Sequence, residues 1–353
     1  MKPKLKDIAD KAEVSVTTVS LVLADKGRIS EDVRRTVWDI AHEMGYQRKK
    51  KTTPKSSDNS DSVGILVSID EEWSFIWSFL RPIIDEIEQS LTKDGKNTVL
   101  IPVHHKAPTD EIFNKIIQSR VQALISLHYG NEQLLSTLEE MDIPAILVMN
   151  NNFQDKFYSV LVDDIQCAYE GTMHLVGLGH RRIAYIECKR PDLPILMNDR
   201  FFGFRKAIEE CSIKVPKDSI LRFELNNSKD LKDQLRTLLD KDPEERPTGI
   251  FCLDDDIALR VINILNEMNI RIPEDVSIIA PGDVLDYSQS FIPRITTMRI
   301  NTTYMGKIIY QMLMNRMEHR PEDLHVLKVK HQLVRRGTCC PPAASEILRK
   351  VQL

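Results

Sequence analysis

The sequence has no apolar run long enough to cross a membrane, and its first residues lack the charged-then-apolar pattern of a signal peptide. Both absences exclude an anchored or exported protein as the first hypothesis. We therefore expect a cytoplasmic chain that works without a membrane partner.

Cysteine is scarce, and its spacing excludes the familiar thiol sites. The six cysteines at positions 167, 188, 211, 252, 339 and 340 form no C-x-x-C pair. We expect reduced thiols of a cytosolic protein, with no metal site and no cofactor.

The composition is that of an ordinary globular protein, but its charge is unevenly distributed. The chain has 353 residues, 42% hydrophobic and 28% charged, which is enough for two or three domains. Residues 1–55 contain 13 Lys and Arg against 8 Asp and Glu, whereas the other 298 contain 35 against 44. A basic start on an acidic body is typical of a protein that presents one end to phosphates.

Residues 4–23 read as two short helices joined by a tight corner. Ile8, Ala9 and Ala12 are spaced as one apolar helical stripe, and Val19, Val22 and Leu23 are spaced as another. Ser15 precedes the second helix, where its hydroxyl can accept a hydrogen bond from a free backbone N–H group.

The second helix begins with small, mostly hydroxyl-bearing side chains, so it can enter a DNA major groove and contact base edges and phosphates. The pattern predicts a helix-turn-helix head. The residues expected to contact DNA are Lys4, Leu5, Lys6, Ser15, Val16, Thr17, Thr18, Ser20, Arg28 and Arg34.

A third helix follows the corner, and a polar segment follows that helix. Ser30 is placed to cap the helix, and its inner face is Val33, Val37, Ile40, Ala41 and Met44, with Trp38 alongside. Residues 48–62 contain no large apolar side chain to bury, so they are predicted to be a linker.

From residue 62 onward, short apolar runs alternate with amphipathic stretches. Strands are expected at 63–67, 98–101, 123–127, 145–148, 183–186, 220–225, 249–253 and 276–279, with helices between them. The alternation runs through once and restarts after residue 160. Two parallel α/β lobes are therefore predicted, with a ligand beyond the carboxyl ends of their strands.

The head resembles that of the lactose-repressor/galactose-repressor (LacI/GalR) family, whose opening runs "T-I-K-D-V-A-x-x-A-G-V-S-x-x-T-V-S-R-V-L". The chain matches at Lys6, Asp7, Ala9, Ala12, Val14, Ser15, Thr18, Val19, Ser20, Val22 and Leu23. It departs at Glu13, where the family has a turn glycine, and at Leu21, where many members have an arginine.

The resemblance continues through the body. It rests on Val162-Asp163-Asp164, on the stretch from His174 to Ile186, on Arg200 to Arg205, on Pro273 to Ser277 and on Leu333 to Thr338. It implies an all-α head on a two-lobe, periplasmic-binding-protein-like body of two Rossmann-like subdomains. The expected division is a head at 1–47, a linker at 48–62, an effector-binding domain at 63–342 and a tail at 343–353. Lobe 1 is expected to hold 63–160 and 292–323, and lobe 2 to hold 161–291 and 324–342.

The family's effector lies between the lobes, and the resemblance assigns candidate contacts. Arg200 matches the arginine that binds effector hydroxyls or carboxylates, and Asp254 replaces an effector-binding asparagine. Asp255 is an alternative cap for the following helix, and a metal site at residues 254–256 is not favoured. Gly282 replaces the family's sugar-gripping aspartate, which leaves Asp283 as the nearest carboxylate.

Two candidate effector contacts lie in the first lobe. Asn150 ends a strand where the family often has an aspartate. Trp73 and Phe75 could stack on a ligand ring, although core packing explains them equally well.

We expect a homodimeric transcriptional regulator, most simply a repressor, that binds a pseudo-palindromic operator and a small effector, for which a carbohydrate is the first choice. The first alternative is a solute-binding protein of the same two-lobe fold, against which the head argues. The second is an α/β enzyme, but the sequence has no nucleophile elbow, phosphate loop or metal pair.

Overall fold

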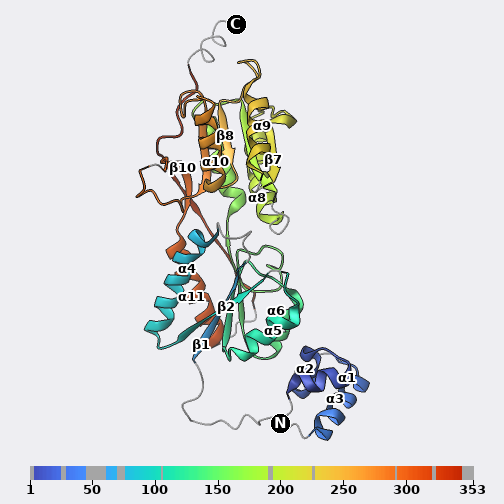
Figure 1. The fold of residues 1–353 in the computed structure, drawn as a ribbon. Helices are drawn as coiled ribbons and strands as arrows, with labels where there is room; N and C mark the ends of the chain where they lie inside the picture. The colour runs from blue at the N-terminus through green and yellow to red at the C-terminus, as the bar shows by residue number, and fades with distance from the viewer. Residues whose placement is uncertain are drawn as a thin grey trace. The chain divides into compact units, whose positions relative to one another are not determined.

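A computed structural model describes residues 4–24, 29–44, 61–69, 76–104, 106–189, 194–224, 227–290, 292–319 and 323–343 (Figure 1). Within these ranges the chain forms a small helical head and two α/β units. No helix among the described residues is both long and apolar enough to span a lipid bilayer.

Three helices make up the head: α1 (Leu5–Ala12), α2 (Val16–Ala24) and α3 (Glu31–Glu43). Ile8, Val19, Val22 and Val37 are fully buried between them, which confirms the apolar stripes predicted from the spacing. Trp38 is 46% exposed, so the expectation that it lies alongside the inner face of α3 is wrong.

The first unit is a six-stranded sheet covered on both faces. Its strand order is β11 (Val326–Val329), β5 (Ser159–Val162), β4 (Ala145–Val148), β3 (Ala123–Leu127), β1 (Ser62–Ser68), β2 (Asn97–Val103). Helices α4 (Trp77–Lys93) and α11 (Thr302–His319) lie together, apart from α5 (Thr109–Gln118) and α6 (Glu132–Glu140) (Figure 1). Because both faces are covered, every residue of β1, β3 and β4 is buried, as the continuous apolar runs predicted.

The second unit repeats this plan. Its strand order is β12 (His331–Val334), β10 (Thr296–Ile300), β9 (Ser277–Gly282), β8 (Gly249–Cys252), β6 (Ile183–Lys189), β7 (Ile220–Glu224). Helices α7 (Asp164–Gly177) and α8 (Pro194–Glu210) share one core with the sheet. Helices α9 (Ser228–Leu239) and α10 (Asp255–Glu267) share the other, and a short 3-10 turn, η2 (Lys217–Ser219), precedes β7.

The chain passes between the units after residues 161, 302 and 327. The predicted return at residue 292 is wrong, because β10 pairs with β9 in the second sheet. The predicted third crossing at residue 324 is also early, since β11 belongs to the first sheet. Strands β11 and β12 are short and partly exposed edge strands, so they have no apolar run that would have revealed them.

Helices α7 and α8 pack unusually closely, and one glycine makes this possible. A Cβ atom on Gly203 would lie 2.1 Å from the backbone oxygen of Ile165. Only glycine therefore allows α8 to approach the first turn of α7. This approach brings Arg200, one turn earlier on α8, to the amino end of α7.

Candidate functional site

The corner between α1 and α2 is built as the sequence predicted. The Ser15 hydroxyl accepts a hydrogen bond from the backbone N–H of Thr18 at 3.0 Å and lies 2.9 Å from the Thr18 hydroxyl. Glu13 ends α1 in the left-handed region, with φ of 53°. The backbone at Glu13 is thus the kind that glycine adopts most easily, although the chain has no glycine there.

The predicted DNA-contacting residues fall into two groups. Lys4 and Lys6 are exposed, and Thr17, Thr18 and Ser20 are half-buried on α2. Leu5 and Val16 pack against the head core, so at least part of each side chain is structural. Arg34 is half-buried on α3, and Arg28 lies outside the described residues.

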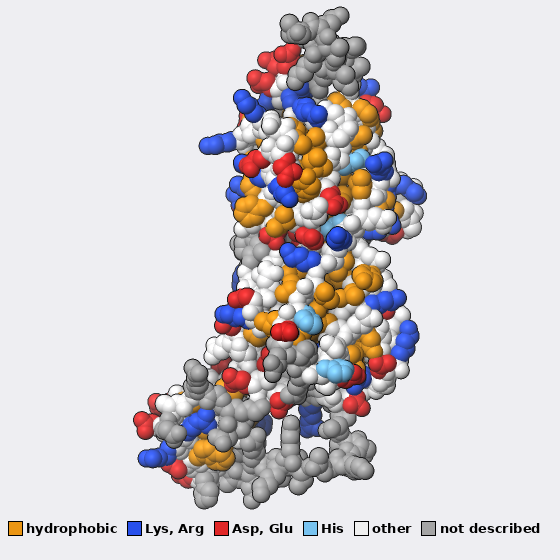
Figure 2. All heavy atoms as spheres, turned by 180° about the vertical axis from the view of Figure 1, so that it is seen from behind, with side chains coloured by type: hydrophobic (Ala, Val, Ile, Leu, Met, Phe, Trp, Pro, Cys, Tyr) orange, Lys and Arg blue, Asp and Glu red, His pale blue; other side chains and the backbone are white. Residues whose placement is uncertain are grey.

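The face of the body seen in Figure 2 shows no extended cluster of Lys and Arg side chains. Lys and Arg side chains alternate there with Asp and Glu over both units. The exposed lysines beside the hydroxyl-bearing helix therefore make the head the best candidate for contact with nucleic acid.

Arg200 lies at the centre of the candidate effector site in the second unit. Its Nε donates to the Asp164 carboxylate at 2.8 Å, and its Nη1 donates to the backbone oxygen of Leu253 at 2.5 Å. Both side chains are less than a tenth exposed. Burial alone would lower the pKa of Arg200, but the negative charge of Asp164 outweighs it and raises that pKa. Burial also raises the pKa of Asp164, and the charge of Arg200 opposes that rise.

Sequence reasoning did not single out Asp164 as a site residue. It follows β5 at the first position of α7. The feature of the sequence that could have identified it is the polar Asp163-Asp164 pair directly after a buried strand. The sequence does not show, however, which arginine forms an ion pair with these aspartates.

The aspartate that caps α10 after β8 is not the one expected. Asp254, not Asp255, caps α10, because its side chain accepts the backbone N–H of Ile257 at 2.9 Å. Asp255 is buried and accepts the N–H of Val284 at 2.8 Å. Burial, helped by the charge of Asp254, raises the pKa of Asp255 to about 7.

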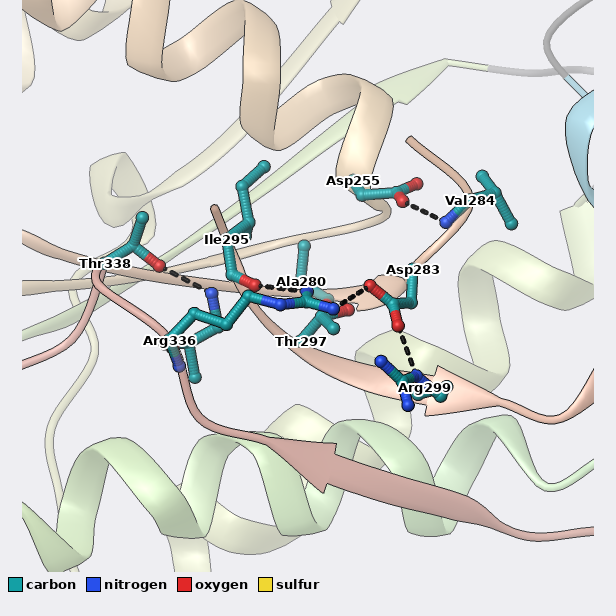
Figure 3. Close-up of polar contacts among 10 residues, drawn as sticks. Asp255, Ala280, Asp283, Val284, Ile295, Thr297, Arg299, Arg336 and Thr338 are labelled. Carbon is teal, nitrogen blue, oxygen red and sulfur yellow. Dashed lines mark hydrogen bonds and ion pairs between the residues drawn. The ribbon is translucent and has the colours of Figure 1, made fainter. Parts of the chain in front are cut away.

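Asp283 lies between two arginines and faces away from Asp255, which turns toward Val284 (Figure 3). Its carboxylate pairs with Arg336 at 2.5 Å and with Arg299 at the carboxyl end of β10. The Arg336 guanidinium also lies 4.4 Å from the centre of the Tyr287 ring. Asp283 therefore organises this edge of the sheet, and its carboxylate is already paired with two cations.

The backbone before Asp283 requires glycine. Gly282 has φ of 138°, and a Cβ atom there would lie 2.5 Å from an Asp255 carboxylate oxygen. At Gly282 the chain therefore has no side chain, and the backbone that follows lies close to the Asp255 carboxylate.

The first unit contributes neutral polar groups at the corresponding edge. Asn150, after β4, donates from Nδ2 to the backbone oxygen of His128 at 3.0 Å and accepts the N–H of Asn152 at 3.0 Å. His128, after β3, is buried, and burial lowers its pKa to about 4. Trp73 and Phe75 lie outside the described residues.

The described residues contain no group of three or more His, Cys, Asp or Glu side chains that could hold a metal ion. The aspartates at 254–256 are engaged in a cap, a backbone contact and an ion pair between Asp256 and Arg260. Their arrangement therefore supports helix and loop structure.

Two family models match parts of the chain. Residues 4–49 match "Bacterial regulatory proteins, lacI family". Residues 172–339 match "Periplasmic binding protein-like domain". The first match covers the head and the second covers most of the second unit.

A curated relative extends the similarity over nearly the whole chain. The chain is 26% identical to the HTH-type transcriptional regulator RegA of Clostridium saccharobutylicum, over 95% of this chain and 99% of that protein. The relative is described as a transcriptional regulator rather than as an enzyme or a transport protein.

Two solved structures share the fold. The CelR–cellobiose complex aligns with a TM-score of 0.67 at 22% identity, over 95% of this chain and 99% of that one. The lac repressor dimer bound to operator aligns with a TM-score of 0.65 at 20% identity, over 96% and 100%. At these identities the structures establish the architecture.

Proposed function

We propose that this chain is a homodimeric repressor, and that a carbohydrate either releases it from operator DNA or recruits it to that DNA. The premise is that the chain belongs to the lacI family of bacterial regulatory proteins and is a DNA-binding transcriptional regulator. The observation that carries this proposal is the head, in which Ser15 caps a helix lined with hydroxyls beside two exposed lysines. A solute-binding protein has no need of such a head.

We assign DNA contact to two kinds of residue. Lys4, Lys6 and Arg34 supply cations for phosphates, which give affinity without sequence information. Thr17 and Ser20 present hydroxyls that can bind either phosphates or base edges. Arg28, whose position in the sequence is its only support, is a further proposed phosphate contact.

Dimerisation and cytoplasmic location follow from the same function. One head offers a short recognition helix, and twofold symmetry doubles the contact with a pseudo-palindromic site. The lac repressor structure is described as a dimer bound to operator, which supports this arrangement here. A regulator of transcription must also work in the compartment that holds the chromosome.

The DNA-binding test begins with selection of a binding site from random duplexes, followed by fluorescence anisotropy at several salt concentrations. Lys6→Ala should weaken binding and reduce the slope of log affinity against log salt by about 1, because one phosphate contact is lost. Lys11→Ala is the matched control, since Lys11 pairs with Glu43 within the head. Failure to select any duplex would contradict the proposal.

We propose a carbohydrate effector at the carboxyl edge of the second sheet, with Arg200 as its main donor and Asp254 as a further contact. Two structural neighbours are described with bound cellobiose and bound ribose, which supports this class. Asn150, Trp73 and Phe75 are kept as contacts from the first unit. Asp283 is a weaker candidate, because two arginines already occupy its carboxylate.

The effector test is a thermal-shift screen of sugars against the intact chain. Arg200→Lys is the informative variant, because lysine keeps a charge near Asp164 but lacks the planar fork of donors. A sugar that stabilises the wild type and the variant equally would remove Arg200 from the site. Sedimentation with and without operator duplex reports the dimer independently.

A further inference from the structure

Beside Arg200, the second unit holds buried polar atoms that form no hydrogen bond. Among the described residues, the Tyr185 hydroxyl and the second carboxylate oxygen of Glu187 form no hydrogen bond of good geometry, although the two side chains lie close enough that Glu187, after burial, raises the pKa of Tyr185. The two ring nitrogens of His331, on β12, are also unpartnered within the described chain. Buried polar groups are nearly always paired, so such a concentration needs an explanation.

Glu187 is held in place on one side only. It lies on β6 with its side chain 3% exposed, and its first oxygen accepts from the Nε of Arg222, its neighbour on β7, at 2.5 Å. The Arg222 guanidinium lies 5.1 Å from the centre of the Phe201 ring. This arrangement fixes the carboxylate and leaves its second oxygen with only the neighbouring Tyr185 side chain close by, so it can accept a further hydrogen bond.

Tyr185 is equally fixed. It lies two residues before Glu187 on β6, so both side chains point to the same face of the sheet. Its ring stacks on Phe251 at 5.8 Å and meets Phe201 edge-on at 5.3 Å. The hydroxyl therefore cannot leave the site to find water without disrupting this aromatic packing.

Both residues adjoin the candidate effector site. Phe201, which touches Tyr185 and Arg222, directly follows Arg200 on α8. The positive charge of Arg200 acts on Tyr185 and on His331, where burial and then Arg200 lower the pKa to about 3. His331 is therefore neutral at physiological pH and adds no positive charge beside the arginine.

We propose that Glu187 determines effector specificity by accepting a hydrogen bond from a hydroxyl or ammonium group of the ligand, with Tyr185 as its neighbouring contact. This inference rests on the proposed effector function. It accounts for the missing carboxylate at Gly282, because the acceptor that a polyol or amino sugar requires is supplied from β6. The predicted ligand class is a hydroxyl-rich sugar or amino sugar.

Isothermal titration of the full chain with cellobiose, ribose and glucosamine tests this assignment. Glu187→Gln should weaken binding of the tightest of these sugars about 10- to 100-fold, because a charged acceptor is lost. Tyr185→Phe, which keeps the aromatic packing, should weaken it about 3- to 10-fold.

Two matched variants control for general effects. Glu224→Gln removes an exposed carboxylate paired with Lys189, and Tyr169→Phe removes a surface hydroxyl bonded to Glu210. Both should bind the same sugar within twofold of the wild type.

The outcomes separate the two proposals. If the wild type binds a sugar and both Tyr185→Phe and Glu187→Gln bind it with unchanged affinity, the role of Glu187 is overturned. The proposed effector function would still stand. If Glu187→Gln does not fold, the test rests on Tyr185→Phe. An unchanged sugar affinity in that variant would by itself overturn the assignment. If the wild type binds none of the three sugars, the ligand class is wrong, while DNA binding by anisotropy still reports on the regulator itself.

Discussion

The two α/β units have the same layered plan but opposite chemistry at the carboxyl edges of their sheets. In the second unit, this edge carries the Asp164–Arg200 pair and the Asp283 carboxylate between two arginines. In the first unit, it carries Asn150 and a neutral, buried His128. The same backbone frame thus supports fixed charges in one unit and neutral amide and imidazole groups in the other.

This difference indicates how the work of recognition is divided. Fixed charges orient polar ligand groups strongly, but each depends on its partner, since an unpaired buried charge is very costly. Neutral groups orient a ligand weakly and can be exchanged at small cost. We therefore expect variants at the second edge to affect stability and pH dependence more than variants at the first.

The largest effect is expected from Arg200→Ala. It leaves the Asp164 carboxylate buried without its cation, which should lower the free energy of unfolding by about 3–5 kcal/mol. Urea unfolding gives the magnitude, and hydrogen exchange of peptides from 162–302 shows which unit is affected. Arg205→Ala is the control, because its ion pair with Glu209 is half-exposed and should contribute less than about 1 kcal/mol. Equal losses in both variants would contradict the contrast between the edges.

The sequence predicted the parts of this edge that depend on local pattern. The buried strand β8 is a continuous apolar run, and Arg200 was found through a motif that also contains Gly203. The glycine is necessary because α8 contacts the backbone of α7 there. Local sequence and tertiary contact agree at this point.

The partners of the charged groups could not be predicted in the same way. Asp283 meets Arg336, which is 53 positions away, through the pairing of β10 with β9 and β12. The cap of α10 was also uncertain, because Asp254 and Asp255 differ by one residue and the choice depends on where the helix begins. Sequence shows which groups are available, and the chain topology decides which of them meet.

The second-largest effect concerns Asp255 and pH. Its folded pKa is about 7, above its ordinary value of 3.8, so the folded chain keeps a proton that the unfolded chain releases. Stability should therefore fall by about 3–4 kcal/mol as pH rises from 4 to 7. Asp255→Asn should remove that decline, as measured by urea unfolding at several pH values. Asp256→Asn, a change in the partly exposed neighbour, should leave it in place.

The first unit should respond to pH in the opposite direction. The folded pKa of His128 is about 4, below its ordinary value of 6.5, so the unfolded chain takes up a proton first as pH falls. Its contribution to stability should decline by about 3 kcal/mol between pH 6.5 and 4. His128→Asn should flatten this decline. Hydrogen exchange of peptides from the first unit, measured at several pH values, reports the local stability. His319→Asn, at an exposed position, should not change it.

The smallest effect is expected from Asn150→Ala at the first edge. The variant loses one hydrogen bond to the backbone of His128 and one from Asn152, both at a half-buried position. We expect a loss of about 1 kcal/mol in the free energy of unfolding, because water can replace part of what is removed. Asn152→Ala, at an exposed position, is the control and should be nearly neutral. If Asn150→Ala destabilises the chain as much as Arg200→Ala, the neutral edge is not the more tolerant one, and the proposed division between the units fails.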